Sequence, residues 1–122
     1  MVAEMIREIQ AARPRAGEVL LWGLGQHSFA VRMGDRVLWL DPFLSDWPGR
    51  LIPSPLRPEE VVCGDLVFGS HDHADHIDRG AWPILARVAP VKFVIPALLA
   101  DRLPGELGIA AERFIPVDDG QT

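Results

Sequence analysis

The sequence predicts a mixed α+β fold, in which a β-hairpin is followed by a β-α-β-α-β succession. Two apolar runs, residues 28–33 and 36–40, indicate the hairpin, because a Gly-Asp pair separates them. Beyond residue 65, short apolar runs alternate with helical stretches. Parallel strands need crossover connections, so we expect these helices to pack on a mixed sheet. The 122 residues suffice for one core, and we expect a single domain over residues 1–122.

The first predicted element is a peripheral amphipathic helix. Its apolar stripe consists of Val2, Met5, Ile6 and Ile9. Pro14 and Gly17 must end this helix. The other expected elements are strands at 19–22, 66–69, 93–95 and 114–117, and helices at 79–88 and 97–103. Pro83 lets the helix at 79–88 begin as late as Trp82.

Residues 42–58 are predicted to form a long loop. Five prolines fall in this segment, and each fixes φ and removes a backbone donor, so neither a helix nor an inner strand can run through it. Five apolar side chains are expected to anchor the loop: Phe43, Leu44, Trp47, Leu51 and Ile52. Ordered loops of this length are usually functional, and we expect a wall or lid over a site.

The composition restricts the class of protein. With 48% hydrophobic and 24% charged residues, the chain has enough apolar side chain for a core, which excludes a wholly disordered protein. A net charge of -5 disfavours binding to a phosphate backbone. Cys63 is the single cysteine, which suits a reducing cytosol and indicates an inert thiol. The charged N-terminal residues give no signal segment, so we expect a cytoplasmic protein with no nucleic-acid or membrane partner.

Three histidines and three aspartates lie within nine residues, directly after the strand expected at 66–69. They are His71, Asp72, His73, Asp75, His76 and Asp78. Neutral imidazoles and carboxylates are metal ligands, whereas packing three partly charged rings without a cation costs desolvation and repulsion. His71 and His73 can point the same way in an extended segment, and a following bend can bring Asp75 and His76 nearby. We therefore predict a site for one or two divalent ions. A solvated loop with free histidines is the alternative.

Nitrogen and oxygen ligands without thiolate suit zinc, manganese or iron alike. Asp72 and Asp78 lie between and after the predicted ligands, so we expect them to orient the ligands or to cap a helix.

The spacing H-x-H-x-D-H in this cluster resembles the signature of the metallo-β-lactamase superfamily. Four sequence segments resemble the branch of this superfamily that contains ascorbate-6-phosphate lactonase. They are LGQHSF at 24–29, LDPFLSD at 40–46, SHDHADHID at 70–78 and AERFIPV at 111–117. The resemblance extends from about residue 19 onward.

The resemblance implies an αββα sandwich with a one- or two-metal site at the edge of the sheet and hydrolysis by metal-bound water. His71 and His73 would hold the first ion, and Asp75 and His76 the second. Asp75 is also the residue expected to be catalytic. Asp41 matches a family aspartate that supports the loop of metal ligands without binding the ion. The alternative is that Asp41 is an Asp-Pro turn residue.

Two features depart from the family pattern. Many relatives carry histidine after the Leu-Gly pair, but Gln26 occupies that place here and His27 follows it, so His27 is expected to hydrogen-bond or pack rather than to ligate. Superfamily domains consist of two βα halves, and the second supplies further ligands, yet this chain has no histidine after His76. We therefore expect only the N-terminal half of such a domain.

The first functional hypothesis is hydrolysis of a lactone or related ester, since a bound divalent ion lowers the pKa of its water to about 7. Gln26 and His27, together with Arg50 and Arg57 of the loop, are candidates for binding a small-molecule substrate that carries an anionic group. Phosphodiester hydrolysis is the second hypothesis. The third is a catalytically silent half-domain that forms a homo-oligomer through an uncovered sheet edge and apolar face.

Overall fold

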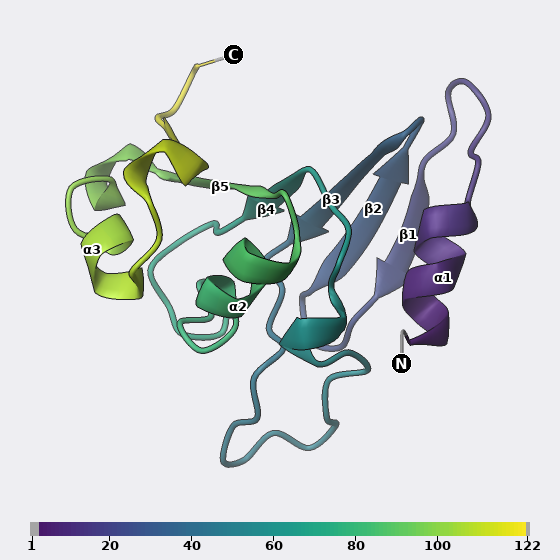
Figure 1. Cartoon of the computed structure of the whole chain (residues 1–122), viewed down its shortest axis with the longest axis horizontal. Helices are drawn as coiled ribbons and strands as arrows, with labels where there is room; N and C mark the ends of the chain where they lie inside the picture. Colours follow the sequence, from purple (N-terminus) through teal and green to yellow (C-terminus); the bar gives the residue numbers. More distant parts are fainter. Residues whose placement is uncertain (1–2, 122) are drawn as a thin grey trace.

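Six strands form one mixed sheet in the computed structural model, which describes residues 3–121 (Figure 1). They are β1 (Leu20–Gly23), β2 (Phe29–Met33), β3 (Arg36–Leu40), β4 (Leu66–Phe68), β5 (Lys92–Pro96) and β6 (Phe114–Val117). The strands follow one another in chain order across the sheet. The first three pair antiparallel, and β3 to β6 pair parallel. This arrangement confirms the predicted hairpin and the mixed α+β fold.

The hairpin has the predicted two-residue turn. Met33 pairs with Arg36, so Gly34 and Asp35 form the loop between β2 and β3. Gly34 has a φ of +55°, a conformation that glycine adopts without steric cost. Because β3 to β6 run parallel, their carboxyl ends lie at one edge of the sheet, and the segments after β3 and β4 meet there.

Three helices pack on one face of this sheet: α1 (Glu4–Ala11), α2 (Trp82–Val88) and α3 (Leu103–Leu107). Their buried side chains belong to the same hydrophobic cluster as those of the strands. Helix α1 buries Ile6 and Ile9 as predicted, whereas Val2 lies outside the described residues. Helix α2 begins at Trp82 with Pro83 in its first turn, where a missing N–H costs nothing.

The helix expected at 97–103 is wrong in its position. A 3-10 turn covers Ala97–Leu99, and α3 begins only at Leu103. Pro104 explains the later start, since proline is favoured in the first turn of a helix and disfavoured further in. Gly108 ends α3 in the left-handed conformation, with a φ of +66°. Two further 3-10 turns cover Pro58–Glu60 and Ala111–Arg113.

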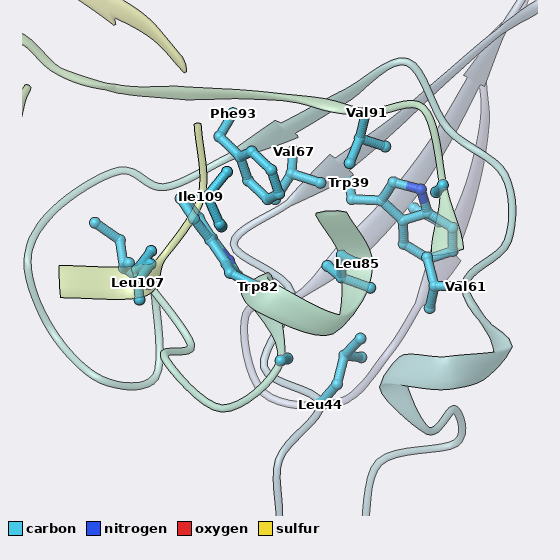
Figure 2. Close-up of a cluster of buried hydrophobic side chains, with 14 of the residues drawn as sticks. Trp39, Leu44, Val61, Val67, Trp82, Leu85, Val91, Phe93, Leu107 and Ile109 are labelled. Carbon is cyan, nitrogen blue, oxygen red and sulfur yellow. The ribbon is translucent and has the colours of Figure 1, made fainter. Parts of the chain in front are cut away.

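The core lies between the strands and the helices, as Figure 2 shows for a cluster of its buried side chains. Phe93 of β5 stacks on Trp82 of α2, with ring centroids 4.7 Å apart. Trp39 of β3 is fully buried, and its Nε1–H donates to the Cys63 carbonyl oxygen at 2.9 Å. Among the described residues, no helix has the length and apolar character needed to cross a membrane.

The loop at 42–58 is anchored by fewer side chains than predicted. Phe43 and Leu44 are buried, and Leu44 reaches the core cluster (Figure 2). Trp47, Leu51 and Ile52, by contrast, are exposed. Polar contacts hold this part of the loop in place of the three apolar side chains, because the Arg50 guanidinium donates to carbonyl oxygens of the loop itself.

The opposite face of the sheet is apolar and exposed. Side chains alternate along each strand, so residues next to core positions point away from the helices. Exposed residues of this outer face come from both edges of the sheet: Leu21, Phe29, Met33, Ile115 and Val117. Pairing places Phe29, Leu40, Phe68, Val94 and Ile115 in one row across five strands.

Candidate metal centre

Three chain segments meet at the carboxyl edge of the parallel strands. The loop of residues 70–78, here called the metal loop, follows β4 directly. Asp41 follows β3, the strand that pairs with β4. The turn of residues 24–28 joins β1 to β2 and carries His27. Parallel pairing of β3 with β4 brings the metal loop next to Asp41, although 29 or more residues separate them in the sequence.

Asp41 connects the end of β3 to both ends of the metal loop. Its carboxylate accepts from the Ser70 backbone N–H at 2.7 Å, from the Ser70 hydroxyl at 2.5 Å and from His76 Nδ1 at 2.7 Å. The residue has a φ of +43°, an uncommon conformation for a side chain other than glycine. Since Asp41 engages Nδ1 of His76, Nε2 is the ring nitrogen left for a ligand.

Ser70 contacts Nδ1 of His71, as Asp41 contacts Nδ1 of His76. The serine hydroxyl donates its single proton to the Asp41 carboxylate, so its 2.9 Å contact with His71 Nδ1 places the proton on that nitrogen. His71 Nε2 then carries the lone pair. Sequence reasoning missed Ser70, and its position between the strand end and the first histidine was the available signal.

His71 and His73 bring two nitrogens close together. His71 Nε2 and His73 Nδ1 are 3.1 Å apart. Two nitrogens that bind one tetrahedral zinc at 2.0–2.1 Å lie about 3.3 Å from each other, so this separation fits a shared ion. Both side chains are exposed. The donor set of this pair therefore suits a divalent metal.

Asp75 and His76 form a second pair of donors beside the first. The Asp75 carboxylate lies 3.9 Å from His76 Nε2, within the range of about 3.0 to 4.2 Å that two ligands of one ion span at metal bonds near 2.1 Å. The ring centroids of His71 and His76 are 3.9 Å apart. Neutral nitrogens and carboxylates packed this closely fit a divalent metal by their chemistry.

His27 reaches the same cluster from the turn between β1 and β2. Its Nε2 lies 2.8 Å from the Asp75 carbonyl oxygen, and its ring stacks on His76 with centroids 3.8 Å apart. One ligand atom each from His27, Asp41 and His76 also fall within 4.8 Å of one another. The hydrogen bond and the stack agree with the predicted packing role.

Asp72 and Asp78 lie away from these donors. Asp72 forms ion pairs with Arg79 and Arg102, and the first of them makes the larger contribution to holding the pKa of this carboxyl below its usual range. Asp78 is only 2% exposed and accepts from backbone N–H groups of both the long loop and the start of α2. Asp78 thus joins the long loop to the segment before α2, whose N-cap residue is Ala81 and has no side-chain capping bond.

The predicted substrate-binding residues lie in different surroundings. Gln26, with a φ of +50°, lines a hollow of about 180 Å³ together with Phe43, Trp47 and Asp75. It also lines a second hollow, of about 300 Å³, beside Arg50. Nη1 of Arg50 donates to the carbonyl oxygens of Phe43 at 2.8 Å and of Ser45 at 3.2 Å, which engages much of its hydrogen-bonding capacity.

Arg57 is exposed and pairs with Glu60, three residues further on. Asp118 and Asp119 line a hollow of about 370 Å³ with Gly69 and Ser70. They lie at the same edge of the sheet as the metal loop.

Comparison with curated proteins finds two relatives of the same kind, and no family model matches the chain. Each relative is named a UPF0173 metal-dependent hydrolase. The protein from Aeropyrum pernix is 39% identical over 54 residues, which are 44% of this chain and 20% of the relative. The protein from Opitutus terrae is 34% identical over 82 residues, which are 67% of this chain and 33% of the relative. The matches thus span no more than a third of the relatives' length.

Solved structures share the fold at lower identity. Igni18, a metallo hydrolase from Ignicoccus hospitalis, is 22% identical with a TM-score of 0.59, over 85% of this chain and 42% of that one. CmlA, a diiron β-hydroxylase from Streptomyces venezuelae, is 21% identical with a TM-score of 0.60, over 89% of this chain and 22% of that one. With the two relatives, these likenesses confirm the resemblance to the metallo-β-lactamase superfamily and its fold.

Proposed function

We propose that this chain provides metal-binding residues of a metal-dependent hydrolase that acts on a small-molecule substrate. The observation that carries the proposal is the convergence of two donor pairs at the carboxyl edge of the sheet. His71 Nε2 lies 3.1 Å from His73 Nδ1, and the Asp75 carboxylate lies 3.9 Å from His76 Nε2. The names of the two curated relatives support the same activity.

In this proposal, His71 and His73 hold one divalent ion, and Asp75 and His76 hold a second. Such an ion, when bound, lowers the pKa of water and polarises the attacked oxygen of the substrate. Asp41 contacts His76 Nδ1 and Ser70 contacts His71 Nδ1, which leaves the Nε2 atom of each ring for the ion. The ion we propose is zinc or manganese, both of which accept nitrogen and oxygen donors.

A lactone or related ester is the proposed substrate, with a phosphodiester as the alternative. The Asp75 carboxylate, 42% exposed, borders the hollow of about 180 Å³ whose wall includes Phe43 and Trp47. These aromatic side chains suit an apolar part of a small ester. Nε and Nη1 of Arg50 donate to the loop carbonyl oxygens, so Arg50 would bind an anionic substituent through Nη2.

Metal analysis and turnover test this function. Purified chain is incubated with zinc or manganese, dialysed and analysed for bound metal, and it is then assayed with a panel of lactones and phosphodiesters. We expect bound metal in the wild type and about half of it in the double variant His71→Ala/His73→Ala, because the Asp75–His76 pair is left in place. Exposed Gln10→Ala serves as the matched control. Equal metal in the double variant and the control would contradict the proposed ligands. The substrate panel separates esterase from phosphodiesterase activity.

The exposed apolar face favours a second candidate function, self-association of the chain. Leu21 is 63% exposed at one edge of this face, and Ile115 is 36% exposed near the other. Extended apolar faces usually mark an interaction surface. Sedimentation velocity between about 5 and 200 µM should show a homo-oligomer that Leu21→Lys/Ile115→Lys dissociates. Leu51→Lys, at a residue 95% exposed on the long loop, is the control and should leave association unchanged. A wild type that is monomeric throughout this range would exclude the second candidate.

A further inference from the structure

We propose that His27 is a positioning residue, which fixes the Asp75–His76 pair in the geometry that binds metal. The proposal rests on the proposed function in one respect, that Asp75 and His76 are ligands. It goes further because His27 lies in a different segment and would act on both ligands without binding the ion.

The first contact is the hydrogen bond to the Asp75 backbone. A carbonyl oxygen can only accept, so His27 Nε2 carries the proton and donates at 2.8 Å. Within residues 3–121, this is the one hydrogen bond that ties the Asp75 peptide to a distant segment. The metal loop's own backbone bonds run from His73 to His71 and from His76 and Ile77 to His73. His27 therefore restrains the part of the loop that these bonds leave unattached.

The second contact is the stack on His76. The two rings are nearly parallel, with an interplanar angle of 12° and centroids 3.8 Å apart. On the same imidazole, Asp41 accepts from Nδ1, and the His71 ring lies 3.9 Å away. The Asp41 hydrogen bond by itself lets the ring tilt about the bonded nitrogen. The stack opposes this tilt and keeps Nε2 beside the Asp75 carboxylate.

The turn of residues 24–28 holds His27 firmly enough for such a role. Gly25 has a φ of +93° and Gln26 a φ of +50°, so two successive left-handed residues reverse the chain. Ser28 N–H donates to the Gly25 carbonyl oxygen at 3.1 Å, and Leu24 N–H donates to that of Ser28 at 2.9 Å. Ser28 also donates from Oγ to the Asp41 carbonyl oxygen at 2.7 Å, which couples the turn to the segment after β3.

Direct ligation by His27 is the rival explanation, since one atom each of His27, Asp41 and His76 fall within 4.8 Å. In the observed geometry, however, these groups are already engaged. His27 Nε2 donates to Asp75, and Asp41 accepts from His76 and from Ser70. An ion bound through His27 Nε2 would displace the hydrogen bond to Asp75, whereas an ion at Asp75 and His76 leaves that bond intact.

Cobalt(II) binding to the whole chain tests the proposal, because both affinity and the visible absorption spectrum report on the ligands. The variants are His27→Ala, His27→Phe, which keeps a stacking ring, and His27→Gln, which keeps an N–H donor; Gln10→Ala is the control. For His27→Ala we expect a Kd for cobalt about 10 to 100 times that of the wild type. His27→Phe and His27→Gln should each recover part of this loss, and the spectrum of the saturated protein should keep its ligand number.

Unfolding curves in urea accompany the titrations, so that a variant that fails to fold is recognised and the other two decide. Wild-type affinity in His27→Ala and His27→Phe would overturn the positioning role alone. A saturated spectrum with one nitrogen ligand fewer in all three variants would overturn it in favour of direct ligation. A wild type that binds no cobalt would instead refute the proposed function itself.

Discussion

Replacing Asp78 should destabilise the protein strongly, because one buried carboxylate serves donors from two segments. Its Oδ2 accepts from the backbone N–H groups of Leu44 and Ser45, each at 2.9 Å. Its Oδ1 accepts from the Ser45 hydroxyl at 2.6 Å and from the N–H groups of Gly80 and Ala81 at 3.1 Å. The residue therefore fastens the long loop to the segment that starts α2.

The size of the destabilisation depends on which donors of Asp78 stay buried, and so cannot bind water, once the carboxylate is removed. The N–H group of Leu44 belongs to a buried residue and costs about 1–3 kcal/mol when left unsatisfied, whereas the N–H group of Ala81 keeps the Asp78 backbone carbonyl oxygen as an acceptor. Water can reach the other donors more easily. Removing a buried charge also recovers part of the lost free energy of unfolding. We therefore expect Asp78→Ala to lower the free energy of unfolding by about 3 kcal/mol. For a chain of this length that is a sizeable part of a total of roughly 6–18 kcal/mol.

Urea unfolding followed by circular dichroism measures the loss. Asp78→Asn keeps the size and one acceptor oxygen, so we expect about 2 kcal/mol, with an unchanged m-value. Asp46→Ala is the matched control, because Asp46 is an exposed residue of the same loop. If both Asp78 variants stay within about 0.5 kcal/mol of the wild type, the carboxylate does not hold the two segments together and the reasoning is refuted.

Three further predictions concern packing, thiol reactivity and acid. Gly69→Ala would place a Cβ 2.7 Å from the side chain of buried Ile77, so it should lower the free energy of unfolding by about 1–3 kcal/mol and lower Tm in a thermal melt. Gly105→Ala, which has open space around it, should not lower the free energy of unfolding. Burial raises the pKa of the Cys63 thiol, so iodoacetamide at pH 7.5 should react more slowly than in urea, and equal rates would contradict this. Arg79 lowers the pKa of Glu106. The stabilisation from the Arg79–Glu106 contact is therefore present above the ordinary carboxyl pKa and is lost as pH falls through the lowered pKa of Glu106. The Tm difference between wild type and Glu106→Gln should thus shrink from pH 7 to pH 3.

Local signals in the sequence were enough for most of the elements. The hairpin depends on alternation and a two-residue turn, both of which lie within thirteen consecutive residues. The helix beginning at Trp82 follows from Pro83 in the same way. The helix expected at 97–103 was wrong, because proline and glycine further along the chain favoured a helix that starts at Leu103. Helix boundaries depend on such neighbours more than on the apolar pattern.

The sequence by itself indicated the cluster of ligand types, but it did not determine that they converge, since nine extended residues can span about 30 Å. Only the tertiary structure decided which distant groups hold this loop. His76 contacts Asp41, 35 residues before it, and the Asp75 carbonyl oxygen contacts His27, 48 residues before it. The physical reason is that parallel pairing of β3 with β4 and the turn after β1 bring distant segments to one edge of the sheet, and no local pattern encodes those contacts.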